Sequence, residues 1–115
     1  MWNVVCVGAG WVTNARHIPT LKKSGRCRVI GIIDKNAVRA AESAEKHKLP
    51  NFGDSLDAPW AERADVFTVG VSPMDHFAVV DHLLEKNKHV LMEKPMCLTV
   101  TEGERLVDKA KAKSK

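Results

Sequence analysis

The chain has 115 residues, of which 44% are hydrophobic and 28% charged, and this balance predicts one globular domain. No apolar run reaches the roughly 18 residues of a membrane span, and the first ten residues lack the basic start and apolar core of a signal peptide. We therefore expect a cytoplasmic protein that binds no membrane. The cysteines Cys6, Cys27 and Cys97 show no Cys-x-x-Cys spacing, which argues against a disulfide framework and against a metal site.

The net charge of +4 is carried by the last few residues of the chain. Lys109, Lys111, Lys113 and Lys115 supply four positive charges, and the remaining residues hold 14 basic and 14 acidic side chains. No aromatic residues alternate with these lysines, as a single-strand binder needs. We expect a solvated helix face here and no nucleic-acid partner.

Strand-like and helix-like segments alternate from the first residue to the last. Strands are predicted at residues 2–7, 28–33, 51–53, 66–71 and 89–92, because these runs are rich in Val, Ile and other apolar residues. Helices are predicted after residue 10 with a break near Pro19, from the N-cap Asn36 through residue 47, and over 75–86 with Asn87 as a left-handed stop. A helical turn is expected within 57–62.

The last helix is expected to begin with a capping box formed by Thr101 and Glu104. The strands at 2–7 and 89–92 read as buried on both faces, which is typical of a parallel sheet covered by helices. The predicted fold is therefore an α/β, doubly wound parallel sheet of the Rossmann-like kind, in a single domain over residues 1–115.

A glycine turn follows the first strand. Gly8 would allow the sharp turn, and Gly10 would let the backbone approach a pyrophosphate without a Cβ clash. The following helix start supplies free N–H groups to an anion. Thr13 stands at the third position of the fingerprint, where glycine or alanine packs helix against strand. The pattern predicts a dinucleotide site.

An acidic residue ends the second strand. Asp34 lies 24 residues after Gly10, close to the spacing of a carboxylate that binds a ribose hydroxyl; a plain helix-capping Asp is the alternative. A carboxylate there repels the extra phosphate of NADP, so NAD is the expected cofactor. Lys35 and Arg39 lie nearby and could neutralise that phosphate, which keeps NADP open. Methyltransferases share both features, so these residues alone do not identify the ligand.

A charged pair held by proline, Glu93-Lys94-Pro95, follows the strand at 89–92. Open α/β sheets bind their ligands at the carboxyl ends of their strands, which is where this pair is expected. An exposed ion pair of little consequence is the alternative.

These segments resemble the Gfo/Idh/MocA family, named for glucose–fructose oxidoreductase and inositol dehydrogenase. The glycine turn with residues 17–21, the segment 65–76, and residues 86–95 with the Glu-Lys-Pro motif carry the resemblance, which covers nearly the whole chain. Three positions depart from the family pattern: Thr13, the Val-Ser-Pro at 71–73, and Asn87 where glycine is usual.

The resemblance implies hydride transfer between a nicotinamide and a carbinol carbon of a sugar, cyclitol or related polyol. Lys94 would be catalytic, stabilising alkoxide charge and assisting proton transfer. Glu93 would hold the cofactor or Lys94. The residues implied for cofactor binding are Gly8, Gly10, Trp11, Val12, Asp34, Ser72, His76, Glu93, Lys94 and Pro95. For Trp11 a packing role is an equally good alternative, and for His76 a helix-capping role is. His17 is expected to be structural.

In this family a second α/β domain supplies substrate contacts. Nothing after Pro95 could provide one here, so the chain is expected to be a truncated cofactor domain, inactive as a dehydrogenase alone. An exposed sheet edge is expected to promote self-association, and the full-length protein is expected to be a homo-oligomer. The alternative function is a nucleotide-binding sensor or partner module without redox chemistry.

Overall fold

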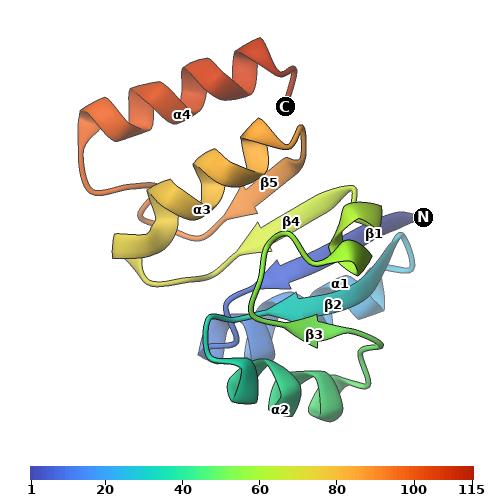
Figure 1. The fold of residues 1–115 in the computed structure, drawn as a ribbon. Helices are drawn as coiled ribbons and strands as arrows, with labels where there is room; N and C mark the ends of the chain where they lie inside the picture. The colour runs from blue at the N-terminus through green and yellow to red at the C-terminus, as the bar shows by residue number, and fades with distance from the viewer.

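The computed structural model describes all residues, 1–115, and shows five parallel strands with helices on both faces (Figure 1). The strands are β1 (Trp2–Val7), β2 (Cys27–Ile33), β3 (Phe52–Gly53), β4 (Val66–Val69) and β5 (His89–Met92). Their order in the sheet is β3-β2-β1-β4-β5. The predicted Rossmann-like sheet is confirmed, because the chain steps outward from β1 in one direction and then crosses back to step outward in the other.

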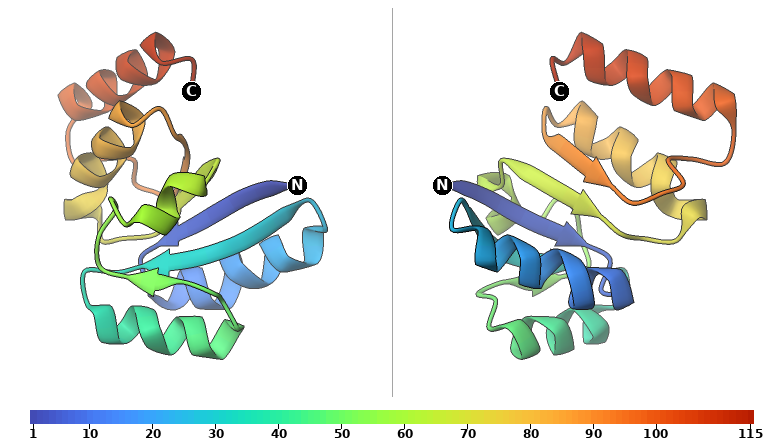
Figure 2. Two further views of the ribbon diagram at one scale, coloured as in Figure 1. Left: turned by 45° about the vertical axis from the view of Figure 1, so that its right-hand side comes forward. Right: turned by 180° about the vertical axis from the view of Figure 1, so that it is seen from behind.

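The helical elements are η1 (Thr13–His17), α1 (Ile18–Ser24), α2 (Ala37–His47), η2 (Pro59–Arg63), α3 (Pro73–Glu85) and α4 (Val100–Ala112). α1 and α2 cover one face of β1 and β2, whereas η2 and α3 cover the other face and α4 packs against α3 (Figures 1 and 2). The sheet therefore separates two apolar cores. None of the helices combines the length and the apolar character needed to cross a bilayer.

The helix after the glycine turn changes type at the expected place. η1 is a π-helical turn in which the Ile18 N–H donates to the Thr13 carbonyl, and Pro19 then opens α1. Proline has no N–H to donate into the preceding turn. The π-helical turn before Pro19 keeps the chain helical. The predicted break is therefore a change from π-helix to α-helix, and the helix is not interrupted.

Most other predicted ends agree with the structure. Asn36 caps α2, its side chain accepting from the N–H groups of Val38 and Arg39. Asn87 has a φ of 62°, the left-handed stop that was predicted after α3. β4 ends at Val69 and α3 begins at Pro73, each two residues earlier than predicted.

The predicted capping box of α4 is wrong by two residues. Thr99 is the N-cap and accepts from the Glu102 N–H, while the Glu102 carboxylate accepts from the Leu98 N–H. The pattern Thr-x-x-Glu occurs at 99–102 and again at 101–104. The first occurrence is used because the helix already begins at Val100.

The prediction that β5 is buried on both faces is also wrong. β5 is an edge strand, and its residues alternate between exposed and half-buried. Val90 and Met92 pack on the core under α3, whereas Leu91 on the opposite face is 62% exposed. An apolar run shows only that a strand can be buried, not which place in the sheet it takes.

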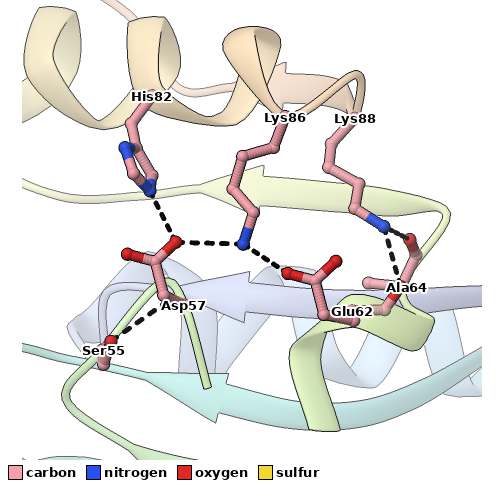
Figure 3. A network of polar contacts seen from close by, with 7 residues as sticks. All are labelled: Ser55, Asp57, Glu62, Ala64, His82, Lys86 and Lys88. Atoms are coloured by element: carbon pink, nitrogen blue, oxygen red, sulfur yellow. Dashed lines mark hydrogen bonds and ion pairs between the residues drawn. The ribbon is translucent and has the colours of Figure 1, made fainter. Parts of the chain in front are cut away.

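A polar cluster fastens the segment before β4 to α3 (Figure 3). His82 contacts the Asp57 carboxylate at 2.8 Å, and Lys86 lies between Asp57, at 3.0 Å, and Glu62, at 2.5 Å. Lys88 donates to the carbonyls of Glu62 and Ala64. This cluster joins the connection before β4, at Asp57 and at η2, to α3 and to the residues that directly follow it.

Candidate functional site

The glycine turn is shaped by its contact with the end of β4. Gly8 has a φ of 97°, and a Cβ added there would lie 2.4 Å from the Gly70 carbonyl oxygen. Only glycine accepts both the left-handed backbone and this close approach. The turn after β1 therefore lies directly against the turn after β4, at the carboxyl edge of the sheet.

Four backbone donors at the start of the helix have no partner in the protein. The N–H groups of Gly10, Trp11, Val12 and Thr13 donate to no acceptor, whereas the Asn14 N–H already bonds the Gly10 carbonyl at 3.1 Å. Free N–H groups at a helix start attract anions. This arrangement suits a phosphate group, as the glycine pattern predicted.

Gly10 has no steric reason to be glycine within the protein itself. A Cβ built there would meet only the Arg39 guanidinium at 3.7 Å, an ordinary contact distance, and its φ lies outside the left-handed range. The residue borders a groove of about 560 Å³. A ligand in that groove could therefore come close to the Gly10 backbone, as the glycine pattern predicts.

The groove runs along the carboxyl edge of the sheet. It is lined by residues of the β1 turn, the end of β2, the connection after β3 and the start of α3: Val7, Gly8, Ala9, Gly10, Ile33, Asp34, Lys35, Arg39, Asp54, Leu56, Gly70, Val71, Ser72, Asp75, Ala78 and Val79. Apolar walls with a few polar groups are typical of a cofactor site. The groove thus joins Gly8, Gly10, Asp34 and Ser72 from the predicted set.

Asp34 holds the turn and lines the groove. One carboxylate oxygen accepts from the Ala9 N–H at 2.7 Å and the other from the Asn36 N–H at 2.8 Å. The side chain is nearly buried. Each carboxylate oxygen has a further lone pair, so these bonds leave room for the predicted hydroxyl ligand. The alternative, that Asp34 itself caps the helix, is wrong, because the side chain of Asn36 is the cap of α2 and Asp34 accepts from the N–H of that cap residue.

An ion pair stands at the far wall of the groove. Lys35 Nζ lies 2.9 Å from an Asp75 carboxylate oxygen, which Ser72 Oγ also approaches at 3.3 Å. The hydrogen bond from Lys35 is the main reason that the pKa of Asp75 is lowered, and the same bond raises the pKa of Lys35. Ser72 is thus engaged with Asp75 and is not a side-chain cap of α3.

The Glu93-Lys94-Pro95 turn lies beside the groove rather than in its wall. The Glu93 N–H donates to the Val69 carbonyl, and its carboxylate lies 3.4 Å from His17 Nε2. Lys94 is exposed and makes no ion pair, and the Lys94–Pro95 peptide is cis. The structure therefore connects the predicted motif to η1 through His17, and leaves the Lys94 ammonium without an ion-pair partner.

Three predicted residues lie elsewhere. Trp11 is 68% exposed and stacks on the Arg16 guanidinium, 5.4 Å from its ring centre, beside a shallower groove that Gly10 also lines. Val12 is half-buried and His76 fully buried, and neither lines the groove. His76 Nε2 contacts the Val71 carbonyl at 2.9 Å, so this side chain supports the loop from beneath.

The sequence analysis missed two contributions. Asn14 bonds the carbonyls of the glycine turn, and its place one helical turn after Gly10 is the signal that could have revealed it. Asp54 and Leu56 line the groove from the connection after β3. A weaker signal for these two residues is that β3 ends at Gly53, at the same edge of the sheet as the other strand ends. No three His, Cys, Asp or Glu side chains come together as a metal site requires.

Comparison with known proteins agrees with this geometry. The family model described as "Oxidoreductase family, NAD-binding Rossmann fold" matches residues 2–115. The UDP-N-acetylglucosamine 3-dehydrogenase of Acidithiobacillus ferrooxidans is 35% identical over 83 residues, which are 72% of this chain and 26% of that protein. The trans-1,2-dihydrobenzene-1,2-diol dehydrogenase of Macaca fascicularis is 29% identical over 113 residues, or 97% of this chain and 34% of that protein.

Solved structures show the same fold. A dehydrogenase (MviM) from Clostridium difficile superposes with a TM-score of 0.89 at 25% identity, covering 97% of this chain and 36% of that one. GenD2 from gentamicin A biosynthesis, solved in complex with NAD, gives 0.91 at 19% identity, over 98% of this chain and 32% of that one. At that identity the likeness concerns the fold alone. The chain spans about a third of the length of the proteins it matches.

Proposed function

The chain belongs to the Gfo/Idh/MocA oxidoreductase family, and from that membership we propose that it is the cofactor-binding part of an NAD(P)-dependent dehydrogenase acting on a carbinol carbon. The matching family is described by an NAD-binding Rossmann fold, and the groove at the carboxyl edge of the sheet is the proposed NAD site. One observation carries the proposal: Gly10, the first of four residues in a row whose N–H groups have no partner in the protein, lines the same groove as Asp34.

Different residues would bind different parts of the dinucleotide. The N–H groups of residues 10–13 would hold the pyrophosphate, with the helix start adding partial positive charge. The Asp34 carboxylate would accept from the ribose hydroxyls. NAD is the favoured cofactor because of that carboxylate, although Lys35 and Arg39 border the same groove and weaken the discrimination against NADP.

Lys94 is the proposed catalytic residue. The nicotinamide supplies or accepts a hydride when the cofactor is bound. The Lys94 ammonium, exposed and without an ion-pair partner, would donate a hydrogen bond to the substrate oxygen and stabilise its developing negative charge. Glu93, held by His17 and by the end of β4, would set the start of this turn.

The substrate is proposed to be a sugar, cyclitol or related polyol. The names of two relatives, a dehydrogenase of UDP-N-acetylglucosamine and one of trans-1,2-dihydrobenzene-1,2-diol, support the carbinol class. Lys94 does not line the groove, and the relatives are about three times longer. We expect no dehydrogenase turnover from these 115 residues alone.

Titration of the chain with NADH and with NADPH, followed by nicotinamide fluorescence and calorimetry, tests the cofactor assignment. We expect saturable binding of both, tighter for NADH. Asp34→Ala should weaken NADH binding by about tenfold or more, since a hydrogen bond to a charged group contributes roughly 1.5–3 kcal/mol.

Two further variants make that experiment decisive. Asp34→Asn keeps one acceptor oxygen and guards against simple loss of fold, which circular dichroism checks. Asp108→Ala removes an exposed carboxylate of α4 outside the groove and should leave binding unchanged. A folded wild-type chain that binds neither nucleotide overturns the proposal.

A further inference from the structure

The two carbonyl groups of the glycine turn are held by side chains from other segments. The Ala9 carbonyl accepts from Asn14 Nδ2 at 3.1 Å and from Arg39 Nη2 at 3.2 Å. The Gly10 carbonyl accepts from Asn14 Nδ2 at 2.9 Å and from the Asn14 N–H at 3.1 Å. One amide group, that of Asn14, therefore bonds both carbonyls.

Holding a carbonyl also aims the next N–H. The peptide unit is planar and trans, so the C=O of one residue and the N–H of the following residue point in opposite directions. Fixing the Ala9 carbonyl thus directs the Gly10 N–H away from Asn14, and fixing the Gly10 carbonyl directs the Trp11 N–H likewise. These are the first two of the unpartnered donors proposed to hold the pyrophosphate.

A histidine from α2 determines which way the Asn14 amide faces. His47 Nε2 lies 3.0 Å from Asn14 Oδ1. Because the Asn14 nitrogen faces the two carbonyls, its oxygen faces the ring, and the His47 Nε2–H is the donor. Burial, aided by Lys46 and Lys22, lowers the pKa of His47 and favours the neutral ring. Lys22 in turn bonds the His47 carbonyl, which ties this end of α2 to α1.

We propose that Asn14 and His47 are positioning residues for the pyrophosphate of the bound dinucleotide. Asn14 aims the N–H groups of Gly10 and Trp11, and His47 holds the Asn14 amide in the orientation that this requires. The inference rests on the proposed cofactor function. It adds two residues that touch no ligand and that lie outside the glycine pattern itself.

Competition between ligands that carry a pyrophosphate and one that lacks it tests the proposal. Kd values for NADH and inhibition constants for ADP and adenosine are measured on the wild-type chain and on Asn14→Ala. We expect NADH and ADP to bind about five- to tenfold more weakly to the variant, the effect of one or two neutral hydrogen bonds, while adenosine changes less than about twofold. Alanine favours helix more than asparagine does, so the fold should persist.

Histidine variants supply the rescue and the control. His47→Ala should weaken NADH and ADP binding by a few-fold, whereas His47→Gln, which keeps an N–H donor, should restore most of the affinity. His89→Ala, on the exposed side of β5, should change nothing. Equal loss for adenosine and ADP, or unchanged NADH binding in a folded Asn14→Ala variant, overturns the inference.

A second readout separates this inference from the proposed function. In the ligand-free chain, Asn14→Ala should shift and broaden the amide NMR signals of Gly10 and Trp11 while leaving those of α3 unchanged. A wild-type chain that binds no dinucleotide, together with this spectral change, contradicts the cofactor function but not the aiming of the two donors. Unaltered Gly10 and Trp11 signals contradict the aiming itself.

Discussion

At the scale of single residues, the two positions of the turn are occupied by glycine for different physical reasons. Gly8 is required by the protein, because its backbone is left-handed and Gly70 lies against it. Gly10 is not required by any protein contact, and it lines the groove. The structure confirms the turn role that the sequence pattern predicted for Gly8, and the pyrophosphate role of Gly10 stays a prediction. The partner of Gly8 could not be read from the sequence pattern, since Gly70 is 62 residues away along the chain.

The two glycines should therefore respond differently to alanine. Gly8→Ala is expected to lower the free energy of unfolding by at least about 2 kcal/mol, because a left-handed alanine and a backbone clash add together. Gly10→Ala should change stability by less than about 0.5 kcal/mol but weaken NADH binding. Urea unfolding and NADH titration of both variants measure this. Equal destabilisation by the two substitutions contradicts the distinction.

At the scale of elements, propensity and periodicity predicted the number, type and order of strands and helices. They failed where the position of an element in the tertiary structure determines its burial or its end. Two overlapping Thr-x-x-Glu patterns were equivalent in sequence, and the structure uses the earlier one. The apolar run of β5 was compatible with a central strand, yet β5 lies at the edge. The contact between Asn14 and His47 could not be predicted from the sequence, because His47 comes from another helix.

The polar cluster between η2 and α3 should make stability depend on pH at the acidic end. Hydrogen bonds from His82 and then Lys86 lower the pKa of Asp57 below its ordinary value. A carboxyl whose pKa is lower in the folded state stabilises the fold at any pH above its unfolded value, and this contribution is lost as the pH falls through the folded value. Asp57 is exposed, so the effect is small.

Asp57→Asn tests that dependence. The variant should be slightly less stable than the wild-type chain near neutral pH, and the difference should shrink as the pH falls from about 5 toward about 3. Urea midpoints at several pH values measure it, with Asp108→Asn on the exposed side of α4 as the control. A difference that stays constant over this range contradicts the role of the carboxylate.

At the scale of the whole molecule, the sheet is covered unevenly. α1 and α2 protect β1 and β2 on one side, but β5 and the adjoining part of β4 have no helix on that side (Figure 2). An apolar hollow is found there, lined by Trp2, Val4, Leu21, Cys27, Val66, Thr68, His89 and Leu91. The two lysines Lys109 and Lys113, by contrast, are half-buried and paired with acidic side chains of α3, which differs from the solvated helix face that was predicted.

This open face and the free edge of β5 should make the 115-residue chain self-associate. Sedimentation velocity is expected to show a concentration-dependent shift from monomer to dimer or larger species. Leu91→Lys should abolish the shift by placing a charge on the open face. Val38→Lys, at a position 66% exposed on α2, should not. A wild-type chain that sediments as a monomer at high concentration contradicts the expectation.

The double engagement of Asp34 has a consequence for how the domain behaves inside a cell. The same carboxylate ties the β1 turn to the start of α2 and faces the groove, so occupancy and folding are thermodynamically linked. A ligand that binds only the native chain at a hundred times its Kd adds about 2.7 kcal/mol to stability. The lifetime of this domain against proteolysis would then follow the supply of dinucleotide around it.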